Sequence, residues 1–134
     1  MRVAISAIGN ELNSPVDPRF GRCNVFIILN TETMDYEASP NSSIGVAHGA
    51  GIGAAQNVAQ QNVEAVITGH VGPNAHMALS QAGIEVYTGA NGTVLEAVEA
   101  FKSGKLSKAR SPTVGGHFGQ GGRGRGTGQG RRRG

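Results

Sequence analysis

Short apolar runs recur along the first 88 residues of the chain, and five of them have the length and composition of β-strands. Residues 2–8 alternate and are rich in β-branched side chains, whereas residues 24–30 form a continuous apolar run that is typical of a buried strand. The other three expected strands are residues 35–39, 64–68 and 84–87. Residues 35–39 are the most polar of the five, which suits a strand at the edge of a sheet.

Three later segments place apolar residues at helical spacing. The expected helices begin near Ile52, Asn74 and Val94. Thr93 and Glu96 have the spacing of a capping box, in which each side chain accepts a hydrogen bond from the backbone of the other residue. This pattern fixes the expected start of the third helix.

The order of these elements, β-β-β-α-β-α-β-α, predicts an α/β domain over residues 1–106. The first three strands suit an antiparallel meander, and right-handed crossovers make the first, fourth and fifth strands parallel. We therefore expect a mixed five-stranded sheet of order 3-2-1-4-5 with three helices.

Open α/β sheets bind ligands beyond the carboxyl ends of their strands, at the point where the strand order reverses. In the expected sheet this point lies beside the first strand. The loops that reach it are residues 9–22, 69–74 and 89–93. The N-termini of the second and third helices lie at the same rim, and free N–H groups there favour anions.

The net charge of +3 is divided unequally along the chain. Residues 1–104 carry four basic and nine acidic side chains, for a net charge of −5, while residues 105–134 carry eight basic side chains and no acidic one. Two of the four basic side chains, Arg19 and Arg22, lie in one loop, which predicts an anion site. The alternative is that Asp17 pairs with one of these arginines and only stiffens the loop.

Residues 107–134 are expected to form a disordered Gly/Arg-rich tail, because half of residues 115–134 are glycine and almost none are apolar. The tail supports an alternative function, a regulatory module that binds polyanions or nucleic acid. Phe118 is its only residue that can stack on a base. Two other interpretations are a solvated tail that offsets the acidic domain and a tail that folds back over the anion site.

The single cysteine excludes an internal disulfide and favours a reducing compartment. No run approaches the roughly 20 apolar residues that a membrane span needs, and the first apolar run is too short for a signal peptide. We expect a cytoplasmic protein without a membrane partner.

The candidate metal ligands are Cys23 and His70, because both lie near the predicted rim. Cys23 directly precedes a buried strand, so the alternative is a small core residue. His48, His76 and His117 lie elsewhere, and no CxxC, HxxxH or HExxH spacing is present. The carboxylates are scattered and no nucleophile is paired with a base. These observations predict a binding protein rather than an enzyme.

Four motifs carry a family resemblance. They are DPRFGR at 17–22, GIGAA at 51–55, GHVGPNA at 69–75 and GIEVY at 83–87. In this order they resemble the dinitrogenase iron-molybdenum cofactor biosynthesis family, which includes nitrogenase accessory proteins and orange-protein-like members. The resemblance spans residues 1–106.

The resemblance implies a ribonuclease H-like fold and the non-enzymatic carriage or insertion of a metal-sulfur cluster that contains molybdenum with iron or copper. Its partners would be the cluster and a protein that delivers or accepts it. Our hypothesis assigns cluster binding to the rim residues Arg19, Phe20, Gly21, Arg22, Gly69, Gly72 and Asn74. Metal ligation is assigned to Cys23 and His70.

Overall fold

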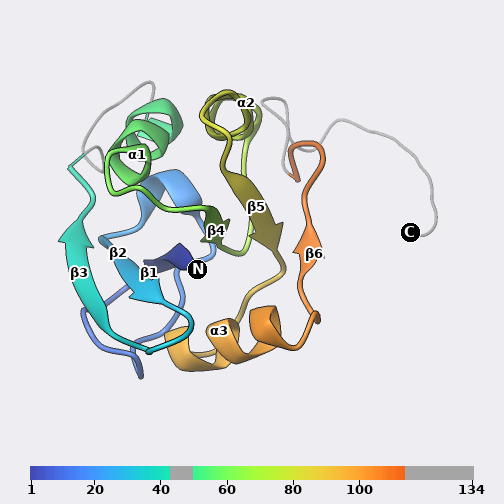
Figure 1. Cartoon of the computed structure of the whole chain (residues 1–134). Helices are drawn as coiled ribbons and strands as arrows, with labels where there is room; N and C mark the ends of the chain where they lie inside the picture. Colours follow the sequence, from blue (N-terminus) through green and yellow to red (C-terminus); the bar gives the residue numbers. More distant parts are fainter. Residues whose placement is uncertain (43–49, 114–134) are drawn as a thin grey trace.

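The computed structural model describes residues 1–42 and 50–113, which form one mixed sheet with helices on both faces (Figure 1). The strands are β1 (Arg2–Ala7), β2 (Val25–Asn30), β3 (Tyr36–Pro40), β4 (Ala65–Ile67), β5 (Glu85–Thr88) and β6 (Ser107–Lys108). Their order is β3-β2-β1-β4-β5-β6. β1, β4 and β5 are parallel, and β2, β3 and β6 pair antiparallel to their neighbours. The predicted α/β fold and its order 3-2-1-4-5 are confirmed.

The prediction of five strands was short by one. β6 pairs with β5 through Tyr87 with Lys108 and Thr88 with Ser107, and Lys108 Nζ lies 2.9 Å from Glu85 Oε2. Residues 107–113 are thus part of the described fold, although the sequence interpretation placed them in the tail. The sequence did not predict β6, because its two residues are polar and exposed and therefore show no apolar pattern.

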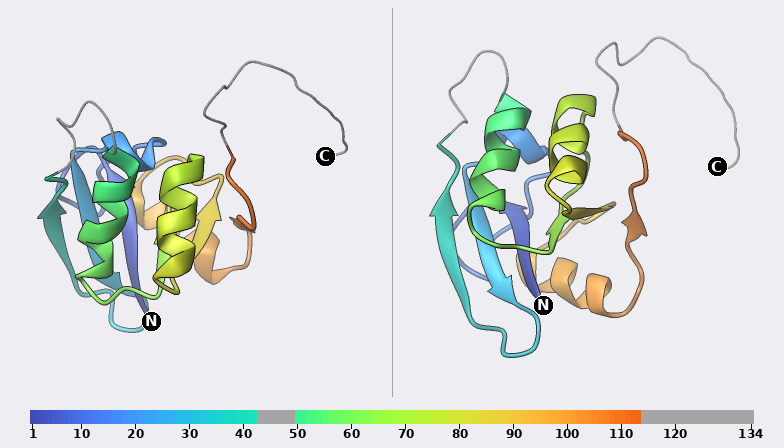
Figure 2. Two further views of the ribbon diagram at one scale, coloured as in Figure 1. Left: turned by 90° about the horizontal axis from the view of Figure 1, so that it is seen from above. Right: turned by 45° about the horizontal axis from the view of Figure 1, so that its top comes forward.

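The helices are α1 (Ala50–Ala59), α2 (Pro73–Gln81) and α3 (Val94–Lys102), with a short 3₁₀ helix, η1 (Phe20–Arg22), before β2. α1 and α2 lie side by side over one face of the sheet, and α3 covers the other (Figures 1 and 2). Alternating side chains of the strands therefore enter two separate apolar layers.

One layer, the α1/α2 layer, contains Ala54, Val58 and Leu79 of the helices together with inward-facing residues such as Phe26 and Val66 of the sheet. The opposite layer, the α3 layer, is built from the other set of strand residues and from one face of α3. Its members include Val3, Ile5, Ile27, Ile67, Val94 and Val98. The sheet is covered on both faces, as the near-continuous apolar run of β2 requires.

Several sequence-based expectations lie outside the described residues: the disorder of 114–134, and the positions of His48 and His117. Within residues 1–42 and 50–113, no helix is both long enough and apolar enough to cross a bilayer.

Candidate functional site

A pocket of about 390 Å³ lies at the carboxyl ends of β1 and β4. Three segments surround it: η1 with the residue before it, the first turn of α1, and the loop that leads from β4 into α2. Its lining residues are Arg19, Phe20, Gly21, Gly51, His70, Gly72, Pro73, Asn74 and Ala75. The site lies where the reversal of strand order predicts a ligand.

The loop after β1 is clamped onto the loop after β4. The His70 backbone N–H donates to the Pro18 carbonyl at 2.8 Å. A side chain at Gly69 would come within 2.7 Å of Pro18 Cα and Cβ, so only glycine permits this contact. The clamp holds Arg19 beside His70, where the two residues form a parallel bridge.

The pocket is narrow because glycines allow η1, α1 and α2 to approach closely. A Cβ on Gly21 would lie 3.1 Å from Gly51 Cα, and a Cβ on Gly51 would lie 3.1 Å from Ala75 Cβ. Contacts this tight leave no room for a larger side chain without displacement of the helices. Small residues therefore set the distance between the pocket walls and expose backbone atoms to a ligand.

The N-terminus of α2 opens into the pocket without a capping side chain. Gly72 is the N-cap residue, and Pro73 follows at the first helical position with no N–H to satisfy. Within the described part of the chain, the backbone N–H groups of Asn74 and Ala75 have no hydrogen-bond acceptor. These donors, with the partial positive charge of the helix end, can receive an anion.

The N-terminus of α3 was expected to offer the same donors, and this expectation was wrong. Thr93 and Glu96 form the predicted capping box. The next N–H groups, of Val94 and Leu95, donate to the carbonyls of Ser14 and Leu12 at 2.9 Å each. The loop after β1 therefore closes this helix end against ligands.

Arg19 is paired with Asp17, as the alternative interpretation of the loop proposed. Arg19 Nε lies 3.1 Å from Asp17 Oδ1, and Nη2 lies 3.1 Å from Oδ2. The Arg19 side chain is 67% exposed and the Asp17 side chain 3%. The hydrogen bond to Asp17 raises the pKa of Arg19, so the guanidinium stays charged while the pair as a whole is neutral. Arg19 therefore lines the pocket as one half of an ion pair with Asp17.

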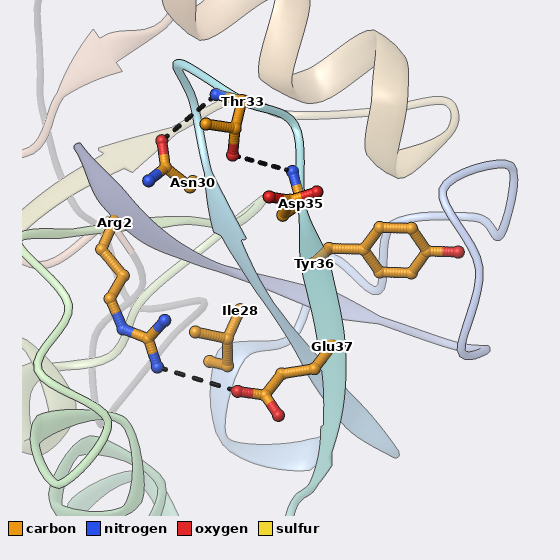
Figure 3. A pocket seen from close by; sticks show the side chains of 7 residues that line it. All are labelled: Arg2, Ile28, Asn30, Thr33, Asp35, Tyr36 and Glu37. Carbon is orange, nitrogen blue, oxygen red and sulfur yellow. Dashed lines mark hydrogen bonds and ion pairs between the residues drawn. The ribbon is translucent and has the colours of Figure 1, made fainter.

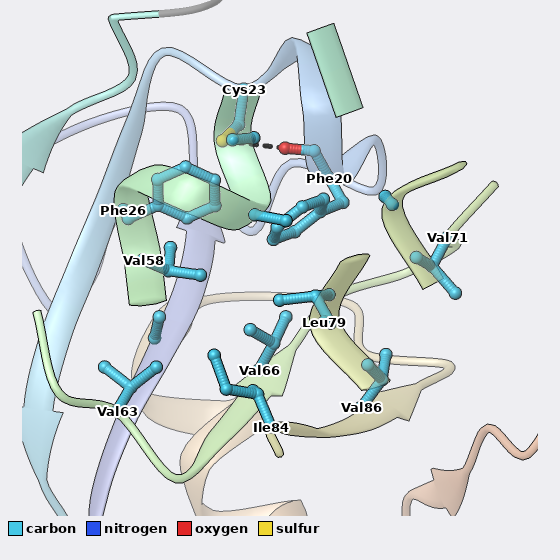
Figure 4. Close-up of a cluster of buried hydrophobic side chains, with 14 of the residues drawn as sticks. Phe20, Cys23, Phe26, Val58, Val63, Val66, Val71, Leu79, Ile84 and Val86 are labelled. Atoms are coloured by element: carbon cyan, nitrogen blue, oxygen red, sulfur yellow. Dashed lines mark hydrogen bonds between the residues drawn. The ribbon is translucent and has the colours of Figure 1, made fainter. Parts of the chain in front are cut away.

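Cys23 lies in the core beneath η1 and does not line the pocket. Its Sγ donates to the Phe20 carbonyl at 3.4 Å, and the residue is completely buried in the same apolar cluster as Phe20 and Phe26 (Figure 4). Burial, reinforced by the negative charge of Asp17, raises the pKa of the thiol to about 12. Metal ligation needs a thiolate, so Cys23 matches the core-residue alternative in this conformation.

The structure brings six of the predicted site residues together: Arg19, Phe20, Gly21, His70, Gly72 and Asn74. Gly69 is buried beneath Pro18, and Arg22 is exposed outside the lining. Gly51, Pro73 and Ala75 also line the pocket, although the sequence interpretation did not assign them to the site. All three belong to the motifs at 51–55 and 69–75, so their place in these motifs could have identified them from the sequence.

Among residues 1–42 and 50–113, His70 is the only histidine or cysteine in the pocket lining. Across residues 1–42 and 50–113, no group of three or more histidine, cysteine, aspartate or glutamate side chains is arranged to hold a metal ion. His76 points elsewhere, with Nε2 3.1 Å from the Ala109 carbonyl. The described residues thus offer a ligand in this pocket the backbone donors of α2 and one imidazole.

A second hollow of about 410 Å³ lies on the β2–β3 hairpin (Figure 3). Its polar groups bond to one another: Asn30 Oδ1 accepts from the Thr33 N–H at 3.3 Å, and Thr33 Oγ1 accepts from the Asp35 N–H at 3.2 Å. Arg2 faces Glu37 at 3.8 Å. These contacts shape the turn of the hairpin and leave few groups to recognise a ligand, so the first pocket is the better candidate.

Comparisons with known proteins identify the family of the chain. A model of the family described as dinitrogenase iron-molybdenum cofactor matches residues 1–104. The apo form of the orange protein from Desulfovibrio gigas is 41% identical, with a TM-score of 0.81, and the match covers 84% of this chain and 95% of that one. An uncharacterized protein from Methanocaldococcus jannaschii is 33% identical over 111 residues, which are 81% of this chain and 91% of the relative. The matched family region contains every lining residue of the pocket.

Proposed function

The chain belongs to the dinitrogenase iron-molybdenum cofactor family, and from this premise we propose that it binds and carries an anionic metal-sulfur cluster without catalysing a reaction on it. The observation that supports the proposal is the uncapped N-terminus of α2 at the floor of the glycine-lined pocket. Concavities lined by successive backbone N–H groups bind anions, including iron-sulfur clusters.

The pocket walls suit a large, soft anion. Phe20, Pro73 and Ala75 present apolar surface, and the backbone donors of Asn74 and Ala75 lie beside it. Sulfide ligands are larger and more weakly hydrated than oxide ligands, so apolar walls cost them less desolvation. N–H donors can hold them without covalent bonds to the protein, which favours release to an acceptor.

His70 is the residue that we propose contacts the metal. Its side chain is exposed at the pocket rim, and its backbone is fixed by the hydrogen bond to Pro18. Imidazole nitrogen suits copper and iron. A cluster that contains molybdenum with iron or copper would then have one protein ligand at its edge, while its sulfides face the helix terminus.

The name of the family favours molybdenum as a component of the cluster. A carrier also needs a protein that supplies the cluster or receives it. We propose that this partner approaches over the pocket mouth, because the neighbouring side chains Arg19, His70 and Asn74 are exposed there.

The proposal can be tested by incubating the protein with tetrathiomolybdate, with and without copper(II), and measuring molybdenum, copper and visible absorbance after desalting. We expect stoichiometric retention of tetrathiomolybdate and poor retention of molybdate. His70→Ala should lose the copper-dependent part of the retained metal. His76→Ala is the matched control, since this imidazole bonds to Ala109 away from the pocket, and it should behave as wild type. Wild-type protein that retains neither molybdenum nor a chromophore would refute the proposal.

A further inference from the structure

The loop between β4 and α2 carries two groups of the proposed cargo site. His70 and Gly72 both line the pocket, and Gly72 is also the N-cap residue of α2. Val71 lies between them and is buried, with only 1% of its surface exposed. Because neighbouring residues share a planar peptide unit, a movement of the Val71 backbone would displace the His70 residue and the start of the helix together.

Thr113 holds the Val71 backbone with three hydrogen bonds. The Val71 N–H donates to Thr113 Oγ1 at 2.8 Å, and the Thr113 N–H donates to the Val71 carbonyl at 2.9 Å. Thr113 Oγ1 donates to the same carbonyl at 3.3 Å. The hydroxyl thus acts as acceptor and donor at once, which valine, a side chain of nearly the same shape, cannot do.

The fold brings Thr113 to this loop although 42 residues separate it from Val71. Residues 107–113, which we call the β6 strap, begin with β6 on the edge of β5. The Ala109 N–H donates to the Val86 carbonyl at 2.8 Å, and His76 Nε2 of α2 lies 3.1 Å from the Ala109 carbonyl. The β6 strap is therefore fixed to β5 and α2 before it reaches the pocket loop.

Two further hydrogen bonds hold the beginning of the same loop. The Gly89 N–H donates to the Gly69 carbonyl at 3.1 Å, and the His70 N–H donates to the Pro18 carbonyl at 2.8 Å. These bonds hold the end of the loop that follows β4, whereas Thr113 holds the end that leads into α2. The His70 backbone and the N-cap of α2 therefore lie on either side of the point where Thr113 acts.

We propose that Thr113 is a positioning residue of the cargo site: through Val71 it holds His70 and the N-terminus of α2 in the arrangement that receives the metal-sulfur anion. This inference rests on the proposed function and adds how the site is kept in its binding conformation. A buried N–H that loses its acceptor is unfavourable, so without the hydroxyl the loop opens towards water. A pocket that is competent for only part of the time binds with a proportionally lower apparent affinity.

The test compares Thr113→Val with wild type in the full-length protein. Valine keeps the backbone N–H of Thr113 and removes both hydrogen bonds of the hydroxyl. We expect the His70 N–H, followed by NMR in the absence of cargo, to exchange with solvent at least about fivefold faster, since the loop opens more often. The affinity for tetrathiomolybdate should fall by a similar factor.

Two control variants separate the hydroxyl from other effects. Thr113→Ser retains the hydroxyl and should restore both exchange and affinity to nearly the values of wild type. Thr33→Val is the matched control, because Thr33 Oγ1 also accepts a backbone N–H, that of Asp35 at 3.2 Å. Thr33 follows β2, which is antiparallel to β1, so it lies at the opposite end of the sheet from the pocket. This variant should behave as wild type, and the melting temperature of each variant checks that the domain is folded.

Equal tetrathiomolybdate affinity of Thr113→Val and wild type would overturn the inference and leave the proposed function intact. Weaker binding with unchanged exchange of the His70 N–H would also overturn it, because the loop would not have opened. The same holds if Thr113→Ser fails to restore binding, since the methyl group would then be responsible. If wild type itself retains no tetrathiomolybdate, the proposed function is refuted, and the role of Thr113 in cargo binding is refuted with it.

Discussion

Replacing Gly72 with aspartate should strengthen the fold and weaken cargo binding at the same time. Gly72 is the N-cap residue of α2, with φ −83° and ψ 175°, a conformation that any residue adopts. An aspartate carboxylate at an N-cap accepts hydrogen bonds from the N–H groups two and three positions later, which here belong to Asn74 and Ala75. In the variant, the aspartate carboxylate would occupy the place of the anionic cargo.

The two effects can be given magnitudes. An N-cap aspartate in place of glycine adds a few tenths of a kcal/mol, and its charge at the helix N-terminus adds about 0.3–1 kcal/mol. Cargo binding loses two charge-assisted hydrogen bonds of about 1.5 kcal/mol each at the lower end of their range. A total of about 3 kcal/mol corresponds to a dissociation constant roughly 100-fold higher.

Urea unfolding and tetrathiomolybdate titration measure the two quantities on the same preparation. Gly72→Asn is the matched control, because asparagine caps the helix without the charge. It should stabilise the fold and weaken binding less than aspartate does. If Gly72→Asp is stabilised and binds as tightly as wild type, the N-terminus of α2 is not the anion receptor and the reasoning fails.

Three further predictions concern the loop after β1 and its surroundings. Gly69→Ala should cost about 1–3 kcal/mol in urea unfolding, because its Cβ overlaps Pro18; an unchanged free energy would contradict the clamp. Asp17→Asn should increase tetrathiomolybdate affinity severalfold by releasing the charge of Arg19, and weaker binding would mean that positioning of Arg19 outweighs its charge. The Cys23 thiol has a pKa of about 12 in the fold against 9.0 when unperturbed, so its stabilising contribution is complete below pH 9 and is lost as the pH rises towards 12. The unfolding free energy should decline over this range more steeply in wild type than in Cys23→Ala, and identical slopes would refute burial of the thiol.

Periodicity and turn residues were sufficient to predict the five-stranded core of the sheet and all three helices. The apolar run of β2 and the capping box of Thr93 are patterns among neighbouring residues. Such patterns can be recognised without knowledge of the tertiary structure. The four motifs were sufficient to predict the family, which the match over residues 1–104 confirms.

Contacts between distant segments were the part that could not be predicted. The closure of α3 by the carbonyls of Leu12 and Ser14 depends on the contact between the loop after β1 and the start of α3. No local sequence pattern indicates this contact. The inward orientation of Cys23 depends in the same way on η1, a single turn too short to show a period. Gly51 faces the pocket only because α1 and α2 are packed together. The sequence of either helix alone does not indicate this packing.

The division of the interior into an α1/α2 layer and an α3 layer has a practical consequence. Every lining residue of the pocket belongs to the α1/α2 side or to its loops, while Ala97 and Val98 pack on the other side of the sheet. Substitutions in the α3 layer can therefore change the stability of the fold without replacing any residue that lines the pocket. Repacking Val98 should shift the melting temperature and leave tetrathiomolybdate binding unchanged, so the α3 layer can vary in sequence while the pocket residues stay the same.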